Sequence, residues 1–394
     1  MPETINHQRR TILLGAAALS AGVLPTVARA VEPLKVGLIV PMSGPFASTG
    51  RQIEAAVKLY MQQNGASVAG RQIEVILKDD GGIAPDVTKR LAQELVSRDK
   101  VQVLAGFGLT PLAFAAAPVA TQGKVPMIVM AAATSVIPQR SPFIVRTGFT
   151  LAQVTAPMAQ WAAKNKIKSV VTFVSDYGPG LDAEKVFVKG FTEGGGKVVD
   201  SLRVPLRNPD YAPFLARVKD AKPDALFVFV PSGEGAAVLK QFTERGLAAA
   251  GIRLICTGDV LDDDLMASIG PAAVGVVSSH HYSAAHPSAE NKVYVEAFGK
   301  ANKGMRPNFH SVGAYDGMHL LYQALKQTNG DSNGEKLLAA MKGMAWTSVR
   351  GPVSIDAATR DIVQTVYIRK VEATGGSFYN MEFDQVDKVR DPGV

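Results

Sequence analysis

Short apolar runs rich in β-branched residues alternate along the chain with longer stretches whose apolar residues recur at helical spacing. Residues 35–40 form the first such run, and residues 53–61 then carry apolar side chains at helical spacing. Residues 74–77 are followed by a second helical pattern across residues 87–95. This alternation predicts repeated βαβ units, and therefore parallel sheets that are covered by helices on both faces. Further strands are predicted at residues 101–104, 127–130, 169–174, 225–230 and 253–256.

The same pattern divides the chain into two α/β halves of similar size. A first series of units ends near residues 145–148, and a second begins with the helix predicted around residues 152–164. Residues 31–150 and 151–280 are therefore expected to form two halves with about four strands each, and a length of 394 residues also favours two domains. The polar segment 380–394 is expected to lie loosely on the surface.

The N-terminus has the three parts of a cleavable export signal. Two arginines at residues 9–10 precede an uncharged run, residues 12–28, and the motif Ala-Arg-Ala at residues 28–30 follows. A membrane anchor would need about 20 strongly apolar residues, whereas this run is mostly Ala, Gly and Ser. We therefore expect residues 1–30 to be a twin-arginine-like signal peptide, cleaved after Ala30 to leave a periplasmic protein. The Sec route also uses basic residues at this place and stays open.

Charge and cysteine content exclude several classes of partner and site. The 42 Lys and Arg residues exceed the 35 Asp and Glu residues by 7, and removal of residues 1–30 lowers the net charge from +7 to +5. This excess is spread along the chain without a run of like charges, which argues against nucleic acid as a partner. The single cysteine, Cys256, excludes an intramolecular disulfide and does not favour a thiolate zinc site.

The sequence lacks the common enzyme motifs. It contains neither a Gly-x-x-x-x-Gly-Lys-Ser/Thr loop nor a Gly-x-Ser-x-Gly elbow, and the nearest match to Gly-x-Gly-x-x-Gly, at residues 106–111, lacks its last glycine. His280, His281 and His286 lie in a segment that looks extended and lacks the Cys or acidic partners of a metal site. We therefore expect a binding protein without catalytic residues, metal or cofactor.

Small and hydroxylated residues follow four of the predicted strands. Ligands in open parallel α/β sheets bind at the carboxyl ends of the strands, where free N–H groups at the start of the next helix attract anions. One such segment alone would be an ordinary turn, but four together are expected to surround a cleft between two lobes. They are Ser43-Gly44-Pro45, Gly108-Leu109-Thr110, Ala131 to Ser135 and Ser175 to Gly178.

These segments and other short motifs resemble those of a known family, the periplasmic leucine/isoleucine/valine-type binding proteins of ABC transporters. The resemblance extends from about Lys35 to the last strands near Ile368, and it depends on the order and spacing of the motifs more than on any one of them. The motifs are Met42-Ser43-Gly44-Pro45, Lys78-Asp79-Asp80, Val125 to Ile128 with Ala133-Thr134, Phe143 to Thr147, Asp176-Tyr177-Gly178 and Arg350 to Val353.

The resemblance implies the type I two-lobed fold, in which three crossovers join two α/β lobes. Residues 281–345 would then return to the first lobe, and residues 346–394 would end in the second lobe and a C-terminal tail. The implied function is to bind a small solute by hinge closure and to deliver it to an ABC permease in the inner membrane. The protein is expected to be a monomer, and a ligand sensor for a regulatory partner is a lesser alternative.

The resemblance also implies a carboxylate site, when its residues are carried over by position. Thr110 matches the family's hydroxyl residue in the binding loop of the first lobe, and Ser43 belongs to the first of the four loops. Ala132 and Thr134 match the pair that holds a ligand carboxylate through the backbone and a hydroxyl, without a lysine or arginine. Thr134 could instead merely cap a helix.

Three further positions concern the rest of the ligand. Tyr177 matches an aromatic residue of the second lobe that closes over the ligand, although it could also be a core tyrosine. Asp259 matches the acidic position that pairs with an amino group. Tyr315 matches an aromatic residue near the third crossover.

Two ligand classes stay open. Members that bind aliphatic amino acids often carry tyrosine where this chain has Thr49, so the side-chain pocket is expected to differ. His281 and Tyr282, together with Tyr177, could contact an aromatic ring and hydrogen-bond a phenol, as in relatives that bind hydroxycinnamates and benzoates. We expect a branched-chain or related amino acid, and keep an aromatic acid as the close alternative.

Overall fold

A computed structural model describes residues 32–393, and its first sheet confirms the predicted series of parallel units. Its strands are β1 (Leu34–Val40), β2 (Ser67–Val68), β3 (Arg71–Asp79), β4 (Val103–Gly106), β5 (Met127–Val129) and β6 (Ile144–Arg146). Their order in the sheet is β2-β3-β1-β4-β5-β6. All pairings are parallel except that of the short β2 with β3. The central strands are buried on both faces, which is why they read as continuous apolar runs in the sequence.

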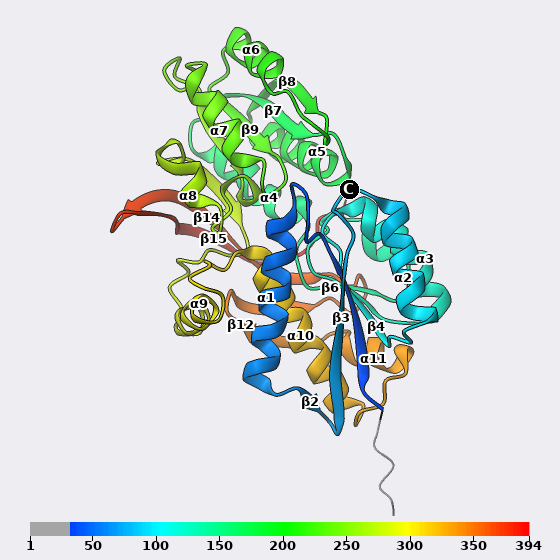
Figure 1. The fold of residues 1–394 in the computed structure, drawn as a ribbon. Coiled ribbons are helices and arrows are strands. Elements are labelled where there is room, and N and C mark those ends of the chain that lie inside the picture. The colour runs from blue at the N-terminus through cyan, green and yellow to red at the C-terminus, as the bar shows by residue number, and fades with distance from the viewer. Residues whose placement is uncertain (1–31, 394) are drawn as a thin grey trace, which may run out of the picture. The chain divides into compact units, whose positions relative to one another are not determined.

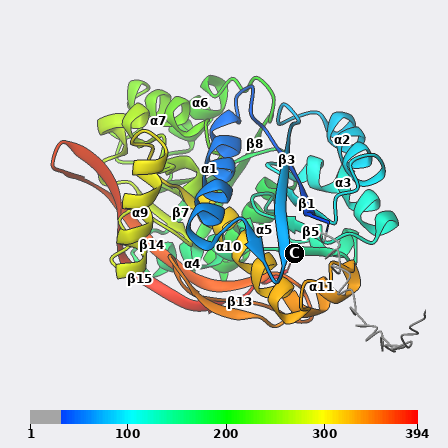
Figure 2. The same cartoon turned by 60° about the horizontal axis from the view of Figure 1, so that its bottom comes forward.

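Helices cover both faces of this first sheet (Figure 1; Figure 2). One face carries α1 (Ala47–Asn64) and α10 (Phe309–Gln327), which pack against each other, and the other carries α2 (Pro85–Ser97) and α3 (Thr110–Gly123). α9 (Ala289–Ala301) packs on α1, and α11 (Gly334–Met341) packs on α10. We call this sheet with these helices lobe 1.

The second sheet has nine strands and is mixed. Its order is β12-β13-β14-β11-β10-β9-β7-β8, and β15 pairs with β14. The five strands from β11 to β8 are parallel, which confirms the predicted arrangement for β7, β9 and β10, whereas β12 to β15 are antiparallel additions. These strands are β7 (Ser169–Ser175), β8 (Lys197–Val204), β9 (Ala225–Phe229), β10 (Arg253–Thr257), β11 (Val277–His280), β12 (Ala345–Ser348), β13 (Gly351–Ile355), β14 (Ile362–Thr374) and β15 (Ser377–Val389).

Helices also cover this second sheet, which we call lobe 2. α4 (Leu151–Lys164) packs with α5 (Gly178–Glu193), and α6 (Ala212–Ala221) packs with α7 (Gly235–Glu244). Short helical segments follow β10, namely the 3₁₀ turns η2 (Gly258–Leu261) and η3 (Gly270–Ala273) and the single turn α8 (Met266–Ile269). β8 was not among the predicted strands, because its charged residues face solvent and interrupt its apolar pattern.

The chain crosses between the lobes three times. It does so between β6 and α4, between β11 and α9, and between α11 and β12. Arg350, buried in the turn after β12, joins the third connection to the first by donating to the carbonyl oxygens of Thr147 (2.6 Å) and Gly148 (3.1 Å). Its guanidinium also lies 2.7 Å from the Asp316 carboxylate on α10. The first and third crossings are therefore neighbours, as in a hinge.

The C-terminal segment differs from the sequence-based expectation. Residues 377–389 form β15, a long edge strand paired antiparallel with β14, and not a loose surface tail. The strand is polar because one edge and much of one face are exposed to solvent. Beyond it, the Asp391 carboxylate accepts hydrogen bonds from Ser135 (2.8 Å) and Thr150 (2.9 Å). The end of the chain is thus held against the loop that follows β5.

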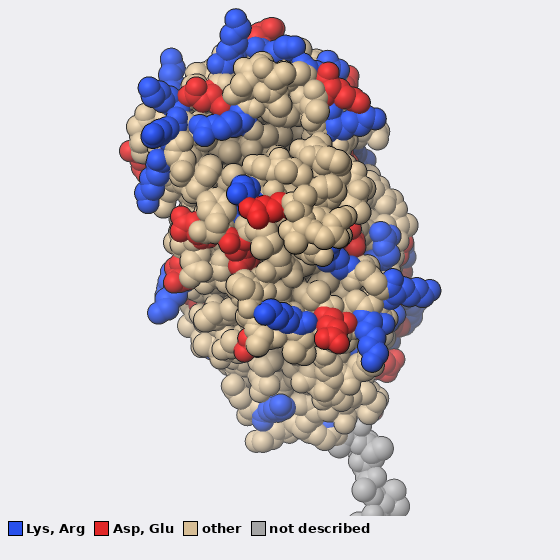
Figure 3. Space-filling view, turned by 90° about the vertical axis from the view of Figure 1, so that its left-hand side faces the viewer, with Lys and Arg blue, Asp and Glu red and all other residues tan. Residues whose placement is uncertain are grey.

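The expected signal peptide, residues 1–30 with its cleavage after Ala30, lies outside the described residues. Among the residues that the structure describes, no helix is both long enough and apolar enough to cross a membrane. Figure 3 shows one face of the molecule, on which basic and acidic side chains are interspersed. This distribution agrees with the spread of charge along the sequence.

Candidate ligand pocket between the lobes

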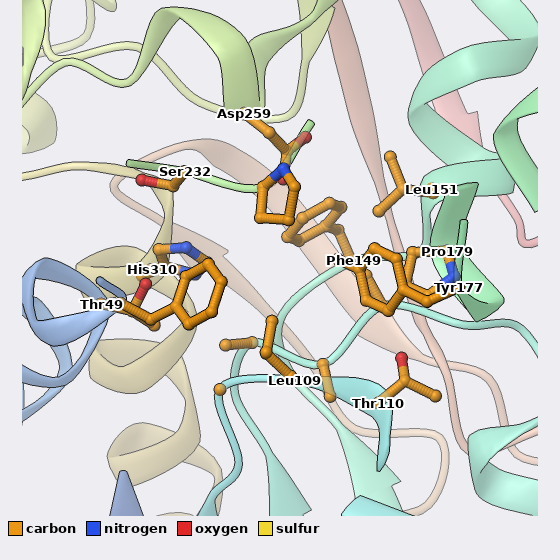
Figure 4. A pocket seen from close by; sticks show the side chains of 16 residues that line it. Thr49, Leu109, Thr110, Phe149, Leu151, Tyr177, Pro179, Ser232, Asp259 and His310 are labelled. Atoms are coloured by element: carbon orange, nitrogen blue, oxygen red, sulfur yellow. The ribbon is translucent and has the colours of Figure 1, made fainter. Parts of the chain in front are cut away.

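A pocket lies between the two lobes (Figure 4). Its lining comes from loops at the carboxyl ends of strands in both sheets, together with the first turns of α1, α3, α5 and α10. The lobes touch around it, since Ser48 donates to Asp264 (2.6 Å) and the Ser135 N–H donates to Asp182 (2.9 Å). The structure therefore has the two lobes in contact around this pocket.

One end of the pocket is suited to an anion. Thr110, the first residue of α3, is 2% exposed and lines the pocket, and its hydroxyl lies 2.9 Å from the hydroxyl of Thr134. If Thr134 donates in this pair, the Thr110 proton is free to donate to a ligand. Gly178 begins α5 directly beside Thr134, so the N-termini of two helices meet here. Both N-termini attract negative charge.

The loop after β5 is held from behind by a buried arginine. Arg146 donates to the carbonyl oxygens of Thr134 (2.9 Å) and Ala132 (3.3 Å), and it is paired with Asp361 at 2.7 Å. Ala132 lines the pocket, but its N–H donates to the Phe107 carbonyl (2.9 Å). This N–H is therefore not free for a ligand carboxylate, which corrects the role expected for Ala132. The arginine itself orders the loop and does not line the pocket.

The opposite end of the pocket carries a carboxylate. Asp259, in η2 at the carboxyl end of β10, is 5% exposed and lies across the pocket from Thr110 in Figure 4. Its Oδ2 atom is 3.4 Å from Nε2 of His280 and has no hydrogen-bond partner among the described residues. Gly258 allows this packing, because a Cβ there would lie 2.0 Å from the Arg369 guanidinium and 2.6 Å from Cβ of His280.

Neutral imidazoles surround this carboxylate. Burial lowers the pKa of His280 to about 4, against the opposing effect of Asp259. Burial also lowers the pKa of His310 to about 3, and His310 lines the pocket. Neither ring is therefore protonated near neutral pH. Within residues 32–393, the lining of this pocket contains no lysine or arginine, so Asp259 has no cationic partner there.

The walls between the two ends are apolar and partly aromatic. The Tyr177 ring stacks on Phe229 at a centroid distance of 6.1 Å. Burial, together with the negative charge of Asp259, raises the pKa of the Tyr177 phenol well above its usual value, so this hydroxyl stays protonated. Such walls suit a flat apolar group between two polar ends. They are formed by Phe46, Leu109, Phe149, Leu151, Tyr177, Pro179 and Pro231.

Five of the residues predicted for the site do not line this pocket: Ser43, Thr134, Tyr315, His281 and Tyr282. Thr134 lies directly behind the lining, with its hydroxyl against that of Thr110. Ser43 is exposed and its hydroxyl bonds to Asp79, because the loop after β1 turns outward. Tyr315 faces α1 and α9 on the far side of α10, where its hydroxyl donates to Gln63 (2.6 Å). It lines a separate, open pocket on that side of the molecule.

The two residues after His280 are also buried away from the pocket. The His281 ring is fully buried against Phe149, at a centroid distance of 5.0 Å. Tyr282 is fully buried and donates to Asn291 (2.9 Å) at the second crossing. The described part of the chain contains no group of three His, Cys, Asp or Glu residues placed to hold a metal ion.

Several lining residues were not predicted from the sequence. His310 and Ser232 line the polar end, and Phe149 forms part of the wall. Asn308 caps α10 by accepting from the backbone N–H groups of His310 (3.0 Å) and Ser311 (3.1 Å). Asparagine is a preferred N-cap residue, and this signal could have placed His310 in the first turn.

Comparison with known proteins agrees with the fold. The model of the periplasmic binding protein family matches residues 33–376. A curated relative, Leu/Ile/Val-binding protein homolog 6 of Brucella abortus, is 42% identical over 97% of this chain and 98% of its own length.

Solved structures of similar proteins include complexes with aromatic acids. A solute-binding protein of an ABC transporter from Rhodopseudomonas palustris BisB5, in complex with 3,4-dihydroxybenzoic acid, is 61% identical, with a TM-score of 0.89 over 91% of this chain and 99% of that chain. Another from R. palustris, in complex with 4-hydroxybenzoate, is 41% identical, with a TM-score of 0.89 over 91% and 98% of the two chains. The chain therefore belongs to the periplasmic binding protein family, and its fold is that of the type I solute-binding proteins of ABC importers.

Proposed function

We propose that this protein binds an aromatic carboxylic acid that carries at least one ring hydroxyl, a hydroxybenzoate-type ligand, in the pocket between the lobes. The observation that carries the proposal is the polarity of the pocket: hydroxyl and helix N-termini at one end, a carboxylate without a cation at the other, and apolar walls between them. The complexes of the 61% and 41% identical structures with hydroxylated benzoic acids support it.

The ligand enters this pocket in one orientation. Its carboxylate lies against the Thr110 hydroxyl and the first turns of α3 and α5, because the other end already holds Asp259 and like charges repel. The ring lies between the apolar walls. The ring hydroxyl then donates to the carboxylate of Asp259, which lines this end of the pocket.

Ligand binding is coupled to lobe closure because both lobes supply contacts. Thr110 belongs to lobe 1, and Tyr177 and Asp259 belong to lobe 2. Only the closed form makes all these contacts at once, so the ligand shifts the population toward it. The closed form is the one we expect a permease to recognise.

The cellular setting follows from the N-terminal sequence and the family. We propose that residues 1–30 direct export and are removed after Ala30, and that the protein acts as a monomer in the periplasm. The ligand is released unchanged to an ABC permease of the inner membrane, so no catalytic residue is assigned. The return of residues 281–345 to lobe 1 and of residues 346–394 to lobe 2 is part of the same proposal.

A branched-chain amino acid is the second candidate ligand. Asp259 could pair with its ammonium group, and the 42% identical relative is named as a homolog of Leu/Ile/Val-binding proteins. An aliphatic ammonium carboxylate, however, places its two charged groups about two bonds apart on one carbon, whereas Thr110 and Asp259 lie at opposite ends of the pocket in Figure 4. We therefore favour the longer aromatic acid.

A thermal-shift series tests the proposed function. Protein without residues 1–30 is heated alone and with 4-hydroxybenzoate, 3,4-dihydroxybenzoate, benzoate and leucine. The hydroxylated acids should raise the melting temperature most, because ligand at a hundredfold excess over Kd stabilises the folded state by about 2.7 kcal/mol. A shift with leucine and none with the aromatic acids would replace this proposal with the amino-acid function.

Replacing Thr110 by valine should weaken binding of 4-hydroxybenzoate about tenfold. The change removes a buried hydroxyl donor to the ligand carboxylate, and a hydrogen bond to a charged group contributes about 1.5 kcal/mol or more. Isothermal titration calorimetry measures the loss. The matched control is Thr121→Val on the same helix, whose hydroxyl bonds to Ala117 and Ser141 away from the pocket. Equal affinities for both variants would show that the carboxylate does not bind at Thr110.

A further inference from the structure

The polar end of the pocket offers two separate groups to a ligand, one from each lobe. Asp259 comes from lobe 2, and His310 comes from the first turn of α10 in lobe 1. We infer that His310 is a specificity-determining residue, because its imidazole hydrogen-bonds a second ring hydroxyl next to the one bound by Asp259. The preferred ligand is then a dihydroxybenzoate with two adjacent hydroxyls. This inference rests on the proposed function and deepens it.

His310 is held rigidly in place. The Asn308 side-chain oxygen accepts from the backbone N–H of His310 at 3.0 Å. The Asn308 side-chain NH₂ donates to both carboxylate oxygens of Asp262, at 3.0 and 2.9 Å. The imidazole packs against the Phe309 ring at a centroid distance of 4.1 Å. A ring fixed in this way can discriminate between hydroxyl positions, because it cannot move to follow the ligand.

The imidazole also has hydrogen-bonding capacity to spare. His310 is 6% exposed, lines the pocket, and its Nδ1 atom has no partner among the described residues. The groups that face it are Asp259 and His280, and burial keeps its pKa at about 3. A neutral imidazole has one acceptor and one donor nitrogen, and it can therefore pair with a neutral hydroxyl in either direction.

Two neighbouring side chains, Ser232 and His280, are less available to this second hydroxyl. The Ser232 hydroxyl already donates to Asp262 in a short hydrogen bond. His280 is fully buried on the far side of Asp259, away from the lining. His310 is thus available to an adjacent hydroxyl on the lobe 1 side of Asp259.

A ligand with one hydroxyl leaves one of these two buried groups without a partner. An unsatisfied buried polar group is costly, so a site built to bind a hydroxyl strongly rejects the analogue that lacks it. A dihydroxy ligand satisfies Asp259 and His310 together. We therefore expect 3,4-dihydroxybenzoate to bind about tenfold or more tightly than 4-hydroxybenzoate.

The test compares ligand preference in three proteins by isothermal titration calorimetry. These are the protein without residues 1–30, its His310→Phe variant, and the control His319→Phe, which changes a histidine of the same helix that lines the separate, open pocket. Each is titrated with 3,4-dihydroxybenzoate, 4-hydroxybenzoate and benzoate. His310→Asn is added because it keeps a donor and an acceptor in a smaller side chain.

In the expected result, the preference for the dihydroxy ligand falls from about tenfold to about twofold or less in His310→Phe. His310→Asn should retain part of the preference, and His319→Phe should retain all of it. An undiminished preference in His310→Phe, or an equal loss for all three ligands, would overturn the role of His310 while the aromatic-acid function stands. Failure of every aromatic acid to bind the unaltered protein would instead overturn both.

Discussion

Replacing Gly178 by alanine should weaken ligand binding about 5- to 150-fold while both lobes stay folded. Gly178 is the first residue of α5 in lobe 2, and a Cβ there would lie 2.5 Å from the Thr134 hydroxyl of lobe 1. The Thr134 methyl and Cβ atoms lie within 3.3 and 3.4 Å of the same point, so rotation of that side chain cannot make room. Overpacking of this kind costs about 1–3 kcal/mol, and here the cost falls on the closed form only.

The size of the effect follows from the coupling between closure and binding. The open form has no such contact between the lobes, and alanine is the better residue within a helix, so unfolding of the unliganded protein should not become easier. Affinity for 3,4-dihydroxybenzoate is measured by calorimetry and stability by thermal melting. The control is Gly299→Ala in α9, where a Cβ would meet its nearest atom only at 3.8 Å.

Two outcomes would contradict the prediction. Unchanged affinity in Gly178→Ala would mean that the ligand does not require the contact between Gly178 and Thr134. A lower melting temperature of the unliganded variant would mean that the change disturbs lobe 2 itself, and not closure.

Replacing Asp259 by asparagine should weaken binding of 4-hydroxybenzoate about ten- to a hundredfold. A hydrogen bond from the ring hydroxyl to a buried carboxylate contributes about 1.5–3 kcal/mol, and the neutral amide is a weaker acceptor. Benzoate lacks that hydroxyl, so its affinity should stay the same or increase, because the variant removes a negative charge from a pocket that holds an anion. Calorimetry with the two ligands measures the difference.

The same variant separates the two candidate ligand classes. If the unaltered protein bound leucine but no hydroxybenzoate, and Asp259→Asn lost the binding of leucine, Asp259 would be assigned to an ammonium group. Asp176→Asn serves as the control, because Asp176 is an exposed carboxylate that precedes Tyr177 and does not line the pocket. A loss of equal size in that control would mean that general charge, and not a contact at Asp259, governs affinity.

The residues at strand ends are the part of the site that could be predicted from sequence. Thr110, Tyr177 and Asp259 all follow a strand of a parallel sheet and precede a helical turn. Their position along the chain therefore places them at the edge of the sheet where ligands bind. The structure brings these three residues together around one pocket.

The direction of a single side chain within a helix, or in an extended segment, could not be predicted in this way. Neighbouring side chains in an extended segment point in opposite directions, so the difference between His280, next to Asp259, and His281, behind Phe149, is one residue of register. Tyr315 and His310 lie on one helix, but five residues of helix turn their side chains to different faces. The N–H of Ala132 is likewise occupied by a hydrogen bond to the carbonyl of Phe107, which lies 25 residues earlier in the chain.

The sequence by itself determined the alternation of strands and helices, the two lobes and the residues at strand ends, because these follow from local periodicity and from the rules of parallel sheets. Only the tertiary structure decided that the C-terminal segment pairs as β15, that Tyr315, His281 and Tyr282 lie outside the pocket, and that His310 lies within it. The physical reason is that each of these outcomes depends on contacts between segments far apart in the chain, which the pattern along one segment does not encode.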